Sequence, residues 1–219
     1  MKTCVALSLL FAGIALAGEA RGQGTVIFSS FGPGDTYDSG SGAGVQGLDS
    51  GYGLFTSGFS FVPASTLTLD TVQIAIGTLS GSNAFSLAIQ AADGPSGTPG
   101  TVLETFEVNG QMQPFGVVNP LITITSVARP ELDAGINYWL VSAGEGDARA
   151  AWNLNDLGLS GTYYSYQGGR EVLLNDQSIG AFRISGVPEP GSAWLVILGF
   201  VVFHVHRLRH PRGKITEQT

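Results

Sequence analysis

The segment Thr66–Ile76 reads TLTLDTVQIAI, and it decides the fold class. Apolar residues recur at every second position, as they do in a β-strand with one face against a core. The alternation slips by one residue at Asp70-Thr71, which predicts a β-bulge or a bend. Between Arg21 and Gly186, no comparably long segment keeps the helical period of about 3.6 residues. The chain is therefore expected to be all-β.

Similar short segments recur along the chain at a spacing of about 8–12 residues. Turn residues separate them, as in Asp93-Gly94-Pro95, Asn109-Gly110 and Gly168-Gly169. This pattern predicts an antiparallel β-sandwich or barrel. The segment Gly32–Gly53 is rich in glycine and serine, and we interpret it as a loop or as a mobile leader before the first full strand. The other expected strands are Phe59–Val62, Phe85–Gln90, Leu103–Val108, Leu121–Thr125, Ile136–Val141, Ala148–Leu154, Tyr163–Tyr166 and Ala181–Ile184.

Residues 1–20 have the organisation of a secretory signal peptide. Lys2 precedes an apolar run, Val5–Ala17, that ends in small residues. The run is short for a transmembrane helix, which needs about 20 apolar residues. Cys4, the only cysteine, would leave with this leader. We expect signal peptidase to remove residues 1–20; a retained anchor or a buried helix is the alternative.

Three unlike features follow one another at the other end of the sequence. Pro188-Glu189-Pro190 precedes an apolar segment at about residues 191–206 and a basic tail, 207–219. The two prolines lack N–H groups and favour an extended chain. The positive charges predict a single transmembrane helix with the tail in the cytoplasm and the preceding domain outside. The anchor residues are Ala193, Trp194, Leu195, Val196, Ile197, Leu198, Phe200, Val201, Val202 and Phe203, and the tail carries Arg207, Arg209, Arg212 and Lys214.

This arrangement resembles the PEP-CTERM sorting signal of Gram-negative bacteria. In that family an exosortase, a membrane enzyme, recognises the signal and removes it near the Pro-Glu-Pro motif. The resemblance implies export, transient anchoring in the inner membrane, and then a place at the cell surface or outside the cell, in association with exopolysaccharide and biofilm. His204 and His206 in the apolar end and the extension to Thr219 depart from the pattern. A single-pass anchor that is never cut is the alternative.

The middle of the chain also resembles a family. Leu69-Asp70-Thr71-Val72, Phe85-Ser86-Leu87, the segment Leu132–Leu140 (LDAGINYWL) and Ala181–Ile184 are similar to the R type of the choice-of-anchor bacterial surface domains. The resemblance implies a jelly-roll-like antiparallel β-sandwich with no known catalytic activity, flanked by a signal helix and a transmembrane helix. The expected division is a signal peptide, 1–20, a Gly/Ser-rich leader with the first strand or strands, 21–58, the sandwich, 59–186, and the sorting signal, 187–219.

The charge of the middle segment excludes several classes of protein. Arg21–Gly186 contains 14 acidic residues against 5 arginines, a net charge of −9, and has no lysine, histidine or cysteine. Such a segment lacks the basic surface that nucleic acids require. Ser-His-Asp and Cys-His catalysis need a histidine base, and zinc sites need histidine or cysteine ligands. An enzyme is therefore not expected.

Two kinds of site could still be built from carboxylates. A pair of them could hydrolyse glycosidic bonds, although solvated surface charges are the simpler interpretation. A loop with hard oxygen ligands could bind calcium, the only cofactor considered, but neither candidate loop has the spacing of a defined calcium motif. The glycosidase candidates are Glu104, Glu107, Asp133, Glu145, Asp147 and Asp156, and the calcium candidates are Asp35, Asp38, Glu145 and Asp147.

Aromatic side chains are the last candidates, because sugar rings stack on them. Trp152, Tyr163, Tyr164 and Tyr166 are the candidate glycan contacts. The competing interpretation places Trp139 and Trp152 in the core, where most strand tryptophans lie. The sequence thus predicts an exported, non-catalytic surface or extracellular-matrix protein. A carbohydrate-binding module and a carboxylate-only glycosidase are the alternatives. The expected partners are signal peptidase, exosortase, the inner membrane and exopolysaccharide, and nucleic acid is not among them.

Overall fold

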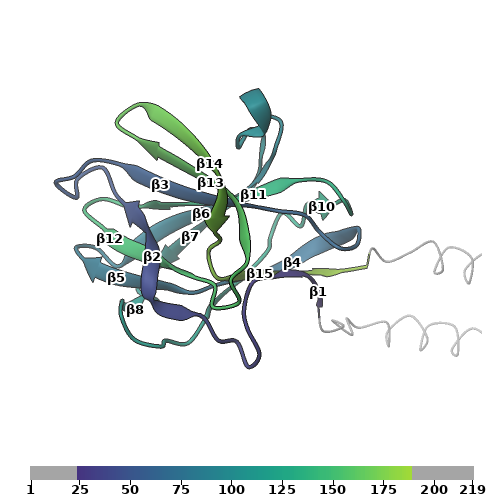
Figure 1. Cartoon of the computed structure of the whole chain (residues 1–219), viewed down its shortest axis with the longest axis horizontal. Helices are drawn as coiled ribbons and strands as arrows, with labels where there is room; N and C mark the ends of the chain where they lie inside the picture. The colour runs from purple at the N-terminus through teal and green to yellow at the C-terminus, as the bar shows by residue number, and fades with distance from the viewer. Residues whose placement is uncertain (1–23, 189–219) are drawn as a thin grey trace, which may run out of the picture. The chain divides into compact units, whose positions relative to one another are not determined.

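The computed structural model describes residues 24–188, and all of its strands lie between Thr25 and Val187 (Figure 1). In this part of the chain there is no α-helix, only a 3-10 turn at Pro95–Gly97. The strands form two sheets in a sandwich-like arrangement. The alternating pattern predicted an all-β sandwich or barrel; the all-β class is confirmed, and the two sheets resemble a sandwich. The expected signal and transmembrane helices lie outside the described residues, and within 24–188 no helix has the length and apolar character needed to span a membrane.

The smaller sheet contains five strands, with β4 and β15 at its centre. Its strands are β1 (Thr25–Ser29), β4 (Leu67–Ile74), β9 (Ile122–Thr125), β10 (Glu131–Leu132) and β15 (Phe182–Val187).

The larger sheet contains ten strands, and its one parallel pairing is between β5 and β8. Each remaining strand expected from the sequence overlaps an observed one. The strands are β2 (Asp38–Gln46), β3 (Phe55–Phe61), β5 (Ile76–Ser80), β6 (Ala84–Ala91), β7 (Val102–Asn109), β8 (Gln113–Pro114), β11 (Tyr138–Gly144), β12 (Arg149–Leu154), β13 (Ser160–Gln167) and β14 (Arg170–Ser178).

The phase slip in the opening segment is a β-bulge. Leu69 pairs with Gly186 of β15, and Thr71 pairs with the preceding Ser185, so Asp70 is the extra residue on β4. Because of this extra residue, the apolar side chains on both sides of the slip face the core. The expected bulge is confirmed. The buried residues of β4 are Leu67, Leu69, Val72 and Ile74.

Thr66–Ile76 supplies parts of two strands, because the chain passes from one sheet to the other at Ala75. The Ala75 N–H donates to the carbonyl of Ala181 at 3.1 Å, and the Asn153 N–H donates to the carbonyl of Ala75 at 2.9 Å. These bonds join β4/β5 to the ends of β12 and β15 along one edge of the sandwich. Beside this junction, the Trp152 ring meets Phe59 edge-on at a centroid distance of 4.9 Å and Phe182 at 5.7 Å.

The expectation of a loop or mobile leader over Gly32–Gly53 is wrong for Asp38–Gln46, which forms β2 and pairs along β12. Val45 is the only fully buried side chain of this strand. At Gly42, an added Cβ would lie 3.0 Å from the Cβ of Ala151. The strand is thus held by backbone pairing and close approach rather than by alternating apolar side chains, and its sequence lacks the usual signature of a strand.

The hairpin β13–β14 forms one end of the larger sheet. β13 pairs with β3, while β14 pairs with β13 alone, and all nine residues of β14 are exposed. Gly168 and Gly169 make the turn with φ of 57° and 81°. The turn brings the end of β13 beside the loop that joins β2 to β3, where a groove lies.

Candidate functional site

A groove of about 610 Å³ lies between the β2–β3 loop and the β13–β14 turn. Its volume is in the range of small-molecule binding sites. Two tyrosines and two leucines provide apolar surface, and none of the lining residues is acidic. The lining residues are Leu48, Tyr52, Gly53, Leu54, Tyr166, Gln167, Gly168, Gly169 and Arg170.

Tyr52 projects from a loop that is well anchored. Gly51 and Gly53 on either side of it have φ of 84° and 76°, values that glycine adopts without strain. The hydroxyl of Ser50 accepts from the Tyr52 N–H and donates to the Gly53 carbonyl, each at 3.3 Å. The Asp49 N–H donates to the Gly146 carbonyl at 2.8 Å. The loop therefore holds Tyr52 in place while 63% of its surface stays exposed.

Arg149 on β12 stacks on Tyr52. The guanidinium carbon lies 4.3 Å from the ring centroid, a cation–π contact. Arg149 pairs across the strands with Gln46 of β2. Among the described residues, the Arg149 Nε and the Gln46 Oε1 are buried without a hydrogen-bond partner. These two atoms are enclosed by the protein and are not exposed to the groove.

Tyr166 and Arg170 form the opposite wall of the groove. Tyr166 is half-buried near the end of β13, in register with Thr56 of β3. Arg170 begins β14, is exposed, and pairs with Gln167 across the turn. The two walls therefore each contribute one tyrosine and lie close to one arginine.

Of the four aromatic residues predicted from the sequence, only Tyr166 lines this groove. Trp152 is fully buried in the core, so its proposal as a glycan contact was wrong. Tyr164 is also buried; its ring meets Trp139 at a centroid distance of 6.0 Å and its hydroxyl donates to Glu171 at 3.2 Å. Burial raises the pKa of Tyr164 to about 12, and the negative charge of Glu171 adds to the shift.

Tyr163 borders a second, smaller hollow of about 310 Å³ between β2 and the β13–β14 hairpin. Its ring packs against Phe59 at 5.3 Å, and its hydroxyl lies 3.0 Å from the hydroxyl of Ser57. Both contacts tie Tyr163 to the rim of the core.

Tyr52 was not among the residues predicted from the sequence. Its sequence does carry a signal, because it is an aromatic residue between two glycines in a polar loop.

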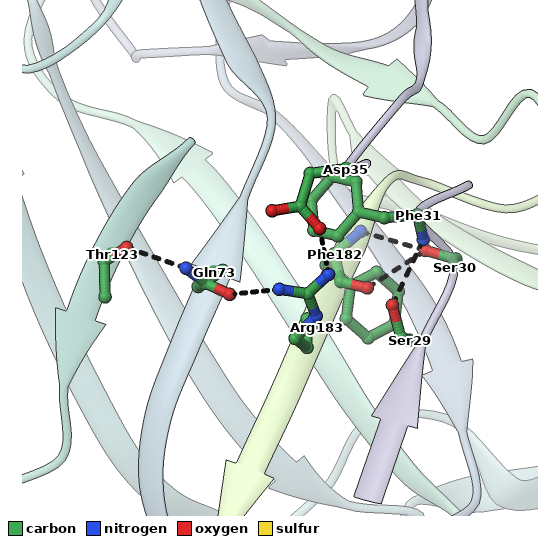
Figure 2. A network of polar contacts seen from close by, with 8 residues as sticks. All are labelled: Ser29, Ser30, Phe31, Asp35, Gln73, Thr123, Phe182 and Arg183. Carbon is green, nitrogen blue, oxygen red and sulfur yellow. Dashed lines mark hydrogen bonds and ion pairs between the residues drawn. The ribbon is translucent and has the colours of Figure 1, made fainter. Parts of the chain in front are cut away.

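The calcium candidate Asp35 has a structural partner. Figure 2 shows the Arg183 guanidinium between Asp35 and Gln73, with an ion pair to Asp35 and a hydrogen bond of 2.9 Å to the Gln73 Oε1. The Gln73 Nε2 in turn donates to the hydroxyl of Thr123 at 3.0 Å. This chain of contacts links β15, β4 and β9 and fastens the β1–β2 loop to the smaller sheet.

The other calcium candidates lie in separate turns. Asp38 accepts from the Gly40 N–H at 2.9 Å, and hydrogen bonds from Ser41 and Gly40 lower its pKa. Asp147 accepts hydrogen bonds from the hydroxyl and the N–H of Ser82. Both lower the pKa of Asp147, and the hydroxyl has the larger effect. Glu145 is exposed in the same loop as Asp147. Within residues 24–188, no three His, Cys, Asp or Glu side chains gather into a metal-binding group.

The glycosidase candidates do not face the groove. Glu104 is 7% exposed, and its oxygens accept from the hydroxyl of Ser126 and the N–H groups of Val127 and Ala128. Glu107 on the same strand is exposed, as are Asp133, Glu145, Asp147 and Asp156. The alternating burial of β7 places Glu104 and Glu107 on opposite faces of the sheet. These two carboxylates therefore do not flank a common bond.

No family model, no curated protein and no solved structure matches this chain. Of the sorting residues expected from the sequence, Pro188 is described and is exposed directly after β15. The remaining ones, from Glu189 to Lys214, lie outside the described residues, as does the expected signal peptide.

Proposed function

We propose that this protein is an exported, non-catalytic surface or extracellular-matrix protein delivered by an exosortase pathway. The observation that carries the proposal is where the compact unit ends. β15 ends at Val187, which pairs with Thr68, and the Pro-Glu-Pro motif begins at the next residue. β1 begins at Thr25, after the expected signal peptide at residues 1–20. Cleavage at either expected site would leave all the described strands within the mature protein.

The proposal includes the finer features expected from the sequence. The sandwich would have jelly-roll-like wiring, and a signal helix and a transmembrane helix at about 191–206 would flank it. The protein would be held in the inner membrane until processing and would then reach the cell surface or the exterior, in association with exopolysaccharide.

The chemistry of the folded unit supports a non-catalytic role. Arg21–Gly186 contains no histidine, cysteine or lysine. The candidate carboxylates Asp35, Glu104 and Asp147 already accept hydrogen bonds or an ion pair inside the fold. Their placement favours a structural role.

Intact mass of the mature protein tests the proposal. The full chain is produced in a Gram-negative host with an exosortase and in the same host without it. In the host with the exosortase, we expect a form that lacks the signal peptide and ends near residues 187–190. Pro188→Ala combined with Pro190→Ala should block the second cut, whereas Pro120→Ala, on an exposed loop, should not. A C-terminus at Thr219 in both hosts would show that the tail is a simple anchor.

A carbohydrate-binding module is the second candidate function. The groove supports it, because Tyr52 and Tyr166 stand on opposite walls and the Tyr52 ring is well exposed. Sugar rings bury their C–H faces against such aromatic surfaces, while nearby polar groups bind the hydroxyls. Retention of the full chain on immobilised glycans is the test. Tyr52→Ala should weaken retention about tenfold, and Tyr37→Phe, which keeps a buried ring, should preserve it.

A further inference from the structure

We infer that the Tyr52–Tyr166 groove binds an acidic glycan, whose carboxylate or sulfate groups are recognised by Arg149 and Arg170. The inference rests on the second candidate function and specifies its ligand. It follows from the distribution of charge in the folded unit. Arg21–Gly186 contains only 5 arginines against 14 acidic residues, yet one of the five, Arg170, lines this groove, and a second, Arg149, stacks on its Tyr52. No acidic side chain lines it.

Arg149 is held in position before any ligand binds. Its guanidinium rests on the Tyr52 ring, and its strand pairs with both β2 and β5. A planar guanidinium fixed in this way forms two parallel hydrogen bonds to a carboxylate or sulfate with little loss of side-chain entropy.

Arg170 supplies the second cation from the other wall. The turn residues Gly168 and Gly169 before it have no side chains, so a ligand can approach the backbone closely. Tyr52 and Tyr166 offer ring surface in the same groove. This arrangement suits a chain in which sugar rings and anionic groups alternate along its length.

The same charges disfavour a nucleic acid in this groove. Nucleic acids bind through an extended basic surface that neutralises many backbone phosphates, and Arg21–Gly186, with a net charge of −9, does not supply one. Two arginines provide local recognition of single anionic groups, without the extended basic surface that phosphate backbones require.

Affinity electrophoresis of the full chain in mild detergent tests the inference. The gels contain a polyuronate, a sulfated polysaccharide, an uncharged glucan, or no polysaccharide. We expect retardation by at least one of the acidic polymers and little by the glucan. Arg170→Ala and Tyr52→Ala should each weaken binding about tenfold, the effect of losing one charge-assisted hydrogen bond or one stacked ring. Arg129→Ala, an exposed arginine between β9 and β10, is the matched control.

Each outcome decides a separate point. Retardation by only one acidic polymer identifies the anionic group. Equal retardation by glucan and acidic polymers overturns the inference on charge but leaves carbohydrate binding standing. No retardation in any gel overturns both. Acidic-glycan binding that survives Arg170→Ala and Tyr52→Ala overturns the site. Arg170→Lys checks the geometry, because it keeps the charge but loses the planar fork and should restore only part of the binding.

Discussion

The carboxylate of Glu104 accepts a hydrogen bond from the hydroxyl of Ser126, a residue 22 positions further along the chain. It also accepts from the N–H groups of Val127 at 2.6 Å and Ala128 at 2.9 Å, while the Ser126 hydroxyl accepts from the Arg129 N–H. One buried side chain on β7 thereby satisfies the backbone of the connection between β9 and β10. The interaction joins an outer strand of the larger sheet to a segment that borders the smaller one.

Removing this carboxylate should destabilise the fold. Glu104→Ala leaves three donors near the protein interior without their acceptor, so we expect the free energy of unfolding to fall by about 1–3 kcal/mol. Urea denaturation followed by circular dichroism measures the change. Glu107→Ala is the matched control on the exposed face of the same strand, with an expected change within about 0.5 kcal/mol. Equal losses in the two variants would contradict the structural role of Glu104.

The two glutamates show how far the sequence determines this structure. A strand was expected at Leu103–Val108 and is observed as part of β7, and its alternating burial then places Glu104 and Glu107 on opposite faces. The partner Ser126 lies in a different connection, and no local pattern links the two. Asp70 is a similar case. The local phase slip predicted a bulge or a bend there, but no local pattern shows that β15 is the strand that pairs with β4 at this point.

The alternation of apolar residues was least informative where long-range packing or backbone pairing determines the structure. β2 has few apolar residues and is held by backbone pairing with β12, with a close approach at Gly42, so its sequence resembles that of a loop. Trp152 and Tyr52 show the same limitation for the site. A tryptophan in a strand can face the core or the solvent, and only the packing of Phe59 and Phe182 around Trp152 places it inside. Tyr52 became a candidate only when the fold brought Tyr166 near it.

Gly180 should not tolerate a side chain. An added Cβ would lie 2.6 Å from the Cε2 of Phe59 and 2.8 Å from the Cε2 of Trp152, and both rings are fully buried. Gly180→Ala is therefore expected to lower the free energy of unfolding by about 1–3 kcal/mol through overpacking. At Gly44 the nearest atom to an added Cβ is 3.6 Å away, on Phe55. Thermal unfolding should show Gly44→Ala close to wild type; a similar loss in both variants would argue against the tight packing at Gly180.

Asp147 should make the stability of the fold sensitive to acid. Hydrogen bonds from the Ser82 hydroxyl and N–H lower the pKa of Asp147 in the folded state below that of the unfolded chain, about 3.9. Its contribution is therefore present above about pH 4 and is lost as the pH falls through the lower folded pKa. Asp147→Asn should make the acid limb of the stability profile shallower, and Ser82→Ala should change it in the same direction. Urea midpoints at stepped pH measure this, and unchanged acid limbs would refute it.

Tyr164 should make the fold sensitive to alkali. Burial, reinforced by the charge of Glu171, raises the pKa of Tyr164 to about 12. An unfolded tyrosine ionises near pH 10, so between about pH 10 and 12 the unfolded chain releases this proton more readily than the folded one. The contribution of Tyr164 is complete below pH 10 and declines as the pH rises through that interval. Phenolate absorbance should show one tyrosine that titrates late in the native protein and is absent in Tyr164→Phe.

Glu171→Gln separates the two causes of that shift. It removes the negative charge beside the Tyr164 hydroxyl but leaves the ring packed against Trp139, so burial still disfavours the phenolate. We expect the late titration to move partway toward pH 10 in this variant. A return to the ordinary value would mean that charge alone holds the proton. No change at all would mean that Glu171 does not act on Tyr164, and their hydrogen bond near the turn of the β13–β14 hairpin would then contribute nothing to the alkaline stability of the fold.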